Sequence, residues 1–133
     1  MTPKLLLDTH ILVRWLAEQK RLSREQMRAL RDAAHRGDPL ALSDITLLEI
    51  AVLFGRTGTK RKTDVHELLS TIESEGFRVI PIDIEIAAEI AAMGDALSDP
   101  ADRAIVATAR VHHLSLVTSD QRIIESRLVS AID

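Results

Sequence analysis

Cysteine is absent from this chain of 133 residues. Without a thiol, the chain can form no disulfide, no thiolate zinc site and no cysteine nucleophile. This absence excludes three classes of site before any motif is considered.

Aromatic residues are scarce, with one tryptophan, two phenylalanines and no tyrosine. Proteins that bind single-stranded nucleic acid by stacking successive bases need more aromatic surface, so binding of the RRM or OB kind is disfavoured. The net charge of -3 also gives no general attraction for nucleic acid. Any nucleic-acid contact must therefore come from a local basic patch.

Long apolar runs are missing as well, since no run approaches the roughly 18 residues that a membrane-spanning helix requires. The N-terminus has one lysine and a short apolar stretch that ends at Asp8, with no small-residue cleavage site of a signal peptide. We therefore expect a cytoplasmic protein with neither a membrane span nor a signal peptide.

The residues that are present predict one globular domain over residues 1–133, because 46% are hydrophobic and 28% are charged. Short apolar segments alternate with segments of helical periodicity. Strands are expected at about 4–8, 40–43, 77–83, 114–120 and 128–132, with helices between them. This alternation predicts a three-layer α/β/α sandwich with a mainly parallel central sheet.

Four carboxylates fall where such a sheet gathers functional groups. Asp8 and Asp120 follow the first and fourth expected strands, Glu49 lies in the helix after the second strand, and Asp102 lies in the first turn of the helix that begins at Pro100. Loops at the carboxyl ends of parallel strands converge, so we expect these four acids to meet in one pocket.

A pocket of carboxylates with no lysine or arginine among them is unfavourable, because like charges resist joint ionisation. A divalent cation removes that repulsion, and oxygen ligands without cysteine favour Mg²⁺ or Mn²⁺. Such an ion suits hydrolysis of phosphodiester bonds. Each acid also has a structural interpretation: Asp8 could be a helix cap and Asp102 an ordinary first-turn acid. The joint pattern carries the prediction.

Three segments, "LLLDTHILVRWL", "LSDITLLEIA" and "DPADRAIVATARVHHLSLVTSD", resemble the PIN-domain ribonucleases, in particular the VapC-like toxins of the Asp-Thr-His branch. The resemblance implies a Mg²⁺- or Mn²⁺-dependent endonuclease that acts on RNA. It also implies a homodimer, and a cognate antitoxin that inserts a tail into the active site. Carried over by position, the metal-binding and catalytic acids are Asp8, Glu49, Asp102 and Asp120, with Thr9, Ser43 and Ser119 as polar neighbours and Asp99 as a supporting or capping residue.

Other polar residues allow two interpretations each. His10 either contacts a phosphate or donates a proton, or it simply packs at a helix start. Arg103 either pairs with an acid or a phosphate, or it forms a surface salt bridge. The basic loop "GRTGTKRK" either binds RNA phosphates or is a solvated loop; its cations are Arg56, Lys60, Arg61 and Lys62.

Two other classes of protein remain as alternatives. A receiver-like or phosphatase-like domain also gathers acids and Mg²⁺ at strand ends, but it generally requires a late lysine, and this chain has none after Lys62. A catalytically idle interaction module would use the same acids structurally. A dinucleotide-binding domain is disfavoured, because the first turn, "DTHILVR", has no glycine.

Overall fold

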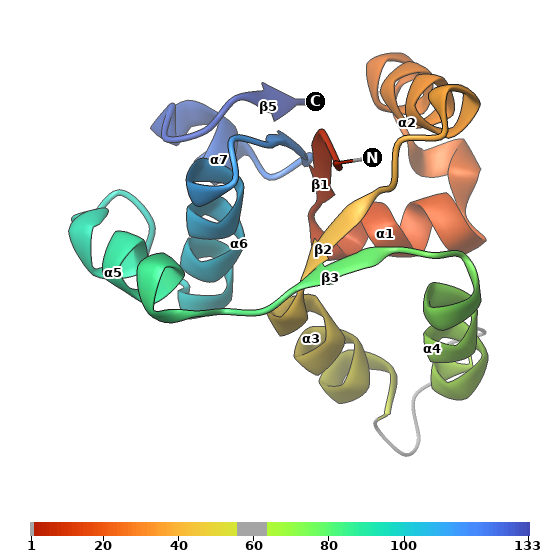
Figure 1. Ribbon diagram of the computed structural model, residues 1–133, viewed down its shortest axis with the longest axis horizontal. Helices are drawn as coiled ribbons and strands as arrows, with labels where there is room; N and C mark the ends of the chain where they lie inside the picture. Colours follow the sequence, from red (N-terminus) through yellow and green to blue (C-terminus); the bar gives the residue numbers. More distant parts are fainter. Residues whose placement is uncertain (1, 56–63) are drawn as a thin grey trace.

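Figure 1 shows the computed structural model of the chain, which describes residues 2–55 and 64–133. The cations Arg56, Lys60, Arg61 and Lys62 of the basic loop lie outside the described residues. The prediction that they contact RNA therefore stays a prediction.

Five strands form one sheet in the order β3-β2-β1-β4-β5, and every neighbouring pair is parallel. The strands are β1 (Leu5–Leu7), β2 (Ala41–Ser43), β3 (Arg78–Ile80), β4 (Ser115–Val117) and β5 (Ala131–Ile132). Each lies inside the segment predicted from the sequence but is shorter. For β1 and β2 the next helix begins almost at once, capped by Asp8 and Ser43. The predicted fold class is confirmed.

The helices between the strands are α1 (Thr9–Ala17), a 3₁₀ turn η1 (Gln19–Arg21), α2 (Arg24–Arg36), α3 (Asp44–Phe54), α4 (Val65–Ser74), α5 (Ile84–Ala92), α6 (Pro100–Val111) and α7 (Gln121–Ser126). The predicted capping box is present at the start of α2, where Ser23 and Gln26 bond each other's backbone amides at 3.1 and 2.9 Å. Within residues 2–55 and 64–133, none of the helices has the length and apolar character needed to cross a membrane.

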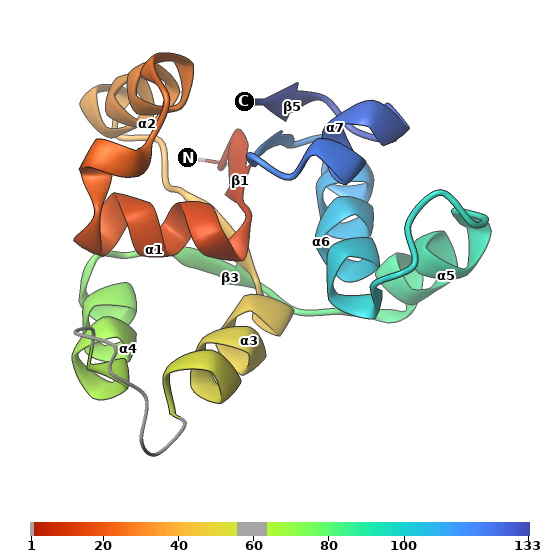
Figure 2. The same ribbon diagram turned by 180° about the vertical axis from the view of Figure 1, so that it is seen from behind.

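Two apolar cores lie on opposite faces of the sheet. Leu6 and Leu116 pack on one face with residues of α5, α6 and α7, whereas Leu5, Leu7 and Val117 pack on the other with residues of α1, α2 and α4. Figures 1 and 2 show these two groups of helices on either side of the strands. Burial on both faces explains why β1 is a continuous run of leucines, with no alternation of polar residues.

The order of strands reverses at β1. The chain adds β2 and β3 on one side of β1, and β4 and β5 on the other. Beyond the strands, the amide of Asp8 donates to the carbonyl of Val117 at 3.0 Å, so the carboxyl ends of β1 and β4 lie side by side. Open parallel sheets hold their ligands at such a reversal, and this edge is where the acids were predicted to meet.

Candidate functional site

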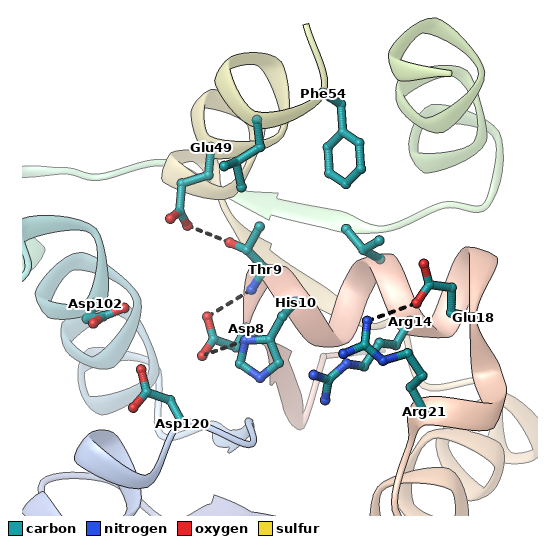
Figure 3. Close-up of a pocket in the computed structure, with 12 residues that line it drawn as sticks. Asp8, Thr9, His10, Arg14, Glu18, Arg21, Glu49, Phe54, Asp102 and Asp120 are labelled. Carbon is teal, nitrogen blue, oxygen red and sulfur yellow. Dashed lines mark hydrogen bonds and ion pairs between the residues drawn. The ribbon is translucent and has the colours of Figure 1, made fainter. Parts of the chain in front are cut away.

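A pocket of ≈ 520 Å³ opens at this edge, and all four predicted acids line it. Figure 3 shows Asp8, Glu49, Asp102 and Asp120 around its mouth. Each comes from a different part of the chain: the end of β1, the middle of α3, the first turn of α6 and the residue that caps α7. The topology therefore brings together side chains that are more than a hundred residues apart.

Asp8 is the most firmly held of these acids. It is buried, with 4% of its surface exposed, and both carboxylate oxygens accept a hydrogen bond. The amide of Thr9 donates to Oδ1 at 2.8 Å, and the hydroxyl of Thr118 donates to Oδ2 at 2.7 Å. Thr118 also accepts from the amide of Asp120 at 3.0 Å. Asp8 is thus both the cap of α1 and a pocket acid, and one threonine connects it to the β4 end of the pocket.

Glu49 is positioned by a pair of threonines. The hydroxyl of Thr9 donates to Oε1 of Glu49 at 2.6 Å, and it lies 2.9 Å from the hydroxyl of Thr46. Because Thr9 has a single hydroxyl proton, Thr46 must donate to Thr9. Burial raises the pKa of Glu49; the hydrogen bond from Thr9 opposes this shift and the charge of Asp8 adds to it.

Asp102 and Asp120 share an arginine. Arg122 donates to Oδ2 of Asp120 at 2.9 Å and to Oδ2 of Asp102 at 3.4 Å. The hydrogen bond from Arg122 lowers the pKa of Asp120. Burial, together with the charges of nearby carboxylates, raises the pKa of Asp102 to about 6. The expectation that no lysine or arginine lies among the acids was therefore wrong. Arg122 lies in the first turn of α7, and its side chain folds back onto Asp120, the residue that caps this helix.

The four carboxylates line one pocket but do not converge on a single position. Within residues 2–55 and 64–133, no three acidic or histidine side chains already surround a position that a metal ion could occupy. Glu49 is directed toward Thr9, and Asp120 toward Arg122, which accounts for the open arrangement.

His10 contacts residues at the carboxyl ends of both β1 and β4. Its Nε2 accepts a hydrogen bond from the amide of Ser119 at 2.9 Å, and its Nδ1 lies 3.6 Å from Oδ2 of Asp8. Burial lowers the pKa of His10, which favours the neutral ring that an Nε2 acceptor requires. In this geometry Nε2 has no proton to give, so the structure favours a positioning role over that of a proton donor.

Part of the pocket was not predicted from the sequence. Its far side is formed by Val13, Arg14, Glu18, Arg21, Leu53 and Phe54. Arg14 donates to the hydroxyl of Ser119 at 3.2 Å, and Arg21 donates to Glu18 at 3.1 Å. Arg14 follows His10 by four residues and so shares its helix face, a signal that the sequence contained.

Three other candidates have structural roles. Arg103 donates to the backbone carbonyls of Ile90, Gly94 and Leu97 at 2.7, 2.6 and 2.6 Å, so both interpretations of it were wrong. This site for its guanidinium could not be seen from the sequence, because its acceptors are backbone carbonyls at the end of α5 and in the loop that follows.

Asp99 and Ser43 are helix caps. Asp99 accepts from the amides of Ala101 and Asp102 at 2.8 and 3.1 Å, which confirms the capping role and anchors the backbone beneath the Asp102 carboxylate. The buried hydroxyl of Ser43 accepts from the amide of Ile45 at 3.3 Å. Ser43 therefore starts α3, the helix that carries Glu49.

Comparisons with known proteins agree with this geometry. A family model described as PIN domain matches residues 5–127. The chain is 35% identical to Ribonuclease VapC22 of Mycobacterium tuberculosis over 119 residues. The aligned region covers 89% of this chain and 88% of that protein.

Solved structures are similar over most of their length. The crystal structure of VapBC2 from Rickettsia felis bound to a promoter DNA fragment has a TM-score of 0.73 at 18% identity, over 98% of this chain and 97% of that one. A toxin-antitoxin complex from Klebsiella pneumoniae has a TM-score of 0.61 at 28% identity, over 88% of this chain and 87% of that one. With its all-parallel sheet, its acid-lined pocket and a family match over nearly its whole length, the chain belongs to the PIN domain family.

Proposed function

We propose that this chain is a Mg²⁺- or Mn²⁺-dependent endoribonuclease and the toxin of a toxin-antitoxin pair. The observation that carries the proposal is the set of four carboxylates around one pocket in a PIN domain. A relative at 35% identity is a ribonuclease, which supports RNA as the substrate.

The donor set fits a hard divalent cation. The acids that would hold it are Asp8, Glu49, Asp102 and Asp120, all of them oxygen donors. Mg²⁺ usually keeps several waters and takes only one or two carboxylates directly, so the open arrangement of these side chains suits it. Burial and, after it, the charges of nearby carboxylates raise the pKa of Asp102, and a bound cation would relieve the repulsion between these charges.

When bound, the ion would activate water and stabilise charge on the phosphate and the leaving oxygen. The protein's own contribution is positioning. Asp8 is held by hydrogen bonds to both oxygens, so its direction is set before any ligand arrives. The hydroxyl of Thr9 donates to Oε1 of Glu49, so this carboxylate is positioned in the same way.

The antitoxin partner belongs to the same proposal. A structure that is 28% identical to this chain is a toxin-antitoxin complex, which supports a cognate antitoxin for this protein. The pocket offers an inserted peptide both apolar and charged walls, with Val13, Leu53 and Phe54 beside Arg14 and Arg21. An antitoxin tail in that position would deny RNA access to the acids.

A homodimer is the expected assembly. Large apolar side chains are exposed on α3, on β3, on the segment that leads into α5 and at the first residue of α5, namely Leu48, Val52, Val79, Ile82 and Ile84. Soluble proteins commonly cover such a patch with a partner, and a second copy of this chain would do so. Analytical ultracentrifugation tests this assembly: we expect the wild type to sediment as a dimer and the Leu48→Glu/Val52→Glu variant to sediment as a monomer.

One experiment tests the enzyme. Purified protein free of antitoxin is incubated with RNA in Mg²⁺, in Mn²⁺ and in EDTA, alongside Asp8→Asn, Glu49→Gln and the control Glu73→Gln, an exposed acid on α4. We expect metal-dependent cleavage by wild type and control, and its loss in both pocket variants. Undiminished Mg²⁺ affinity in an Asp8→Asn/Asp102→Asn double variant would contradict the shared metal site. An idle interaction module would cleave no RNA under any of these conditions.

A further inference from the structure

Helix α2 carries a row of three arginines and one histidine on its outer face. Arg24, Arg28, Arg31 and His35 follow one another at intervals of four, three and four residues and are all exposed. At about 100° per residue they lie within roughly 60° of one another around the helix. The buried residues of α2 are Gln26, Leu30 and Ala33, which lie on the opposite side. The row, called the α2 stripe below, therefore faces solvent along its whole length.

The α2 stripe is one-sided in charge. Residues 18–36 contain six Lys or Arg and three Asp or Glu, in a chain whose net charge is -3. Within the described part of the chain, Arg28 has an ion pair with Glu25 at 3.6 Å, and neither Arg24 nor Arg31 has an acidic partner within 4.0 Å. A row of three arginines of which one has an acidic partner carries an excess of positive charge, which favours an anionic partner.

The α2 stripe continues the acid pocket. Arg21 of η1 lines the pocket, while its neighbour Lys20 lines a second hollow together with the four residues of the stripe. Figure 3 shows Arg14 and Arg21 on the side of the pocket away from Asp102 and Asp120. Figure 2 shows α1 leading through the short turn η1 into α2 on the same side of the sheet. Basic residues therefore line both hollows, with Arg14 and Arg21 in the acid pocket and Lys20 and the α2 stripe in the second one, and Glu18 and Asp32 are the acids beside them.

We propose that the RNA strand leaves the pocket across Arg14 and Arg21 and lays the phosphates that flank the cleaved bond along the α2 stripe. This inference rests on the proposed ribonuclease function. From Arg24 to His35 the helix rises about 16 Å, which spans several successive nucleotides. Contacts of this kind fix the register of the strand and add affinity, but they carry no base specificity.

The test compares RNAs of two lengths. A tetranucleotide fills the pocket alone, whereas a single strand of about 30 nucleotides also reaches α2. The variant is Arg24→Gln/Arg31→Gln. Its control is Ser70→Asp/Arg127→Gln, which makes the same change in net charge at exposed positions outside α2. For the variant we expect kcat/KM on the long RNA to fall about tenfold at low salt and to be unchanged on the tetranucleotide. The control should match wild type on both.

A binding assay in EDTA measures the same contacts without cleavage. For the long RNA, the slope of log K against log salt should become shallower by about 0.7 for each lost phosphate contact, or about 1.4 for the double variant. An unchanged slope, an equal loss on both RNAs, or a loss confined to affinity for the antitoxin would overturn the inference. If wild type cleaves neither RNA, the proposed function fails, and the EDTA slopes still decide whether α2 binds RNA.

Discussion

The two halves of the acid pocket hold their carboxylates by different means. Asp8 and Glu49 receive hydrogen bonds from the hydroxyls of Thr118 and Thr9, at 2.7 and 2.6 Å. These donors are neutral and belong to residues that are themselves buried. They fix the direction of each carboxylate and leave its negative charge in place.

The other half depends on a cation. Asp120 and Asp102 face the guanidinium of Arg122, whose side chain is 69% exposed. An exposed pair of this kind contributes little stability and exchanges readily with other ions. The comparison indicates a rigid half, set by the fold, and an adjustable half, whose internal cation would give way to a divalent ion under the proposed function.

The largest effect should come from removing the charge in the rigid half. Asp8→Asn should lower RNA cleavage by about 10²- to 10³-fold, because the amide keeps the shape but presents a donor where a metal ligand is needed. Asp120→Asn should lose less, since Arg122 already offsets that charge. Initial cleavage rates under saturating Mn²⁺ compare the two variants. Equal losses would remove the distinction between the halves.

The threonine that holds Asp8 should matter nearly as much. Thr118→Val leaves Oδ2 of Asp8 without its donor and should reduce metal affinity or activity by about 10- to 100-fold. Titration calorimetry with Mn²⁺ provides the affinity. The control is Thr71→Val, which removes a hydroxyl that donates to the carbonyl of Glu67 in its own helix. Similar affinities in the two variants would show that Asp8 needs no such support.

The adjustable half should respond to pH. Because the pKa of Asp102 is about 6, metal binding must displace a proton below that pH. Mg²⁺ affinity should then fall about tenfold for each pH unit below 6, and Asp102→Asn should show a weaker dependence. Mg²⁺ affinities measured between about pH 4.5 and about pH 7.5 would reveal this dependence on pH. If Asp102→Asn showed the same dependence, another titratable group would be responsible for it.

The same pKa affects the metal-free fold. The ordinary value for this group is 3.8, so folded Asp102 binds its proton more tightly than the unfolded chain does. The resulting stability is fully present below about pH 4 and is lost as the pH rises through about 6. Thermal unfolding in EDTA should show this loss in wild type and a smaller one in Asp102→Asn.

The smallest effect should come from Arg122. Arg122→Gln removes the cation that competes for Asp120 and Asp102, so Mn²⁺ should bind about two- to fivefold more tightly, as expected for an exposed ion pair. Arg127→Gln, at the residue directly after the same short helix, is the charge-matched control. Weaker Mn²⁺ binding by Arg122→Gln would mean that this arginine supports the site.

The sequence by itself determined the fold class and the edge of the sheet at which the acids meet. Apolar runs such as Leu5–Leu7 reveal a buried strand through local composition, and Ser23 with Gln26 reveals a helix start through a local hydrogen-bonding pattern. Topological rules then place the ends of parallel strands together without any knowledge of side-chain positions. For this reason the four acids could be assigned to one pocket in advance.

Only the tertiary structure decided what each side chain contacts. His10 accepts from the amide of Ser119, which is 109 residues away, and Arg103 is held by backbone carbonyls of α5 and of the loop after it. The approach of Arg122 to the acids, and the continuity of the pocket with α2, depend on how far each helix is rotated about its axis. That rotation is set by the packing of whole faces against the sheet, and no short stretch of sequence encodes it.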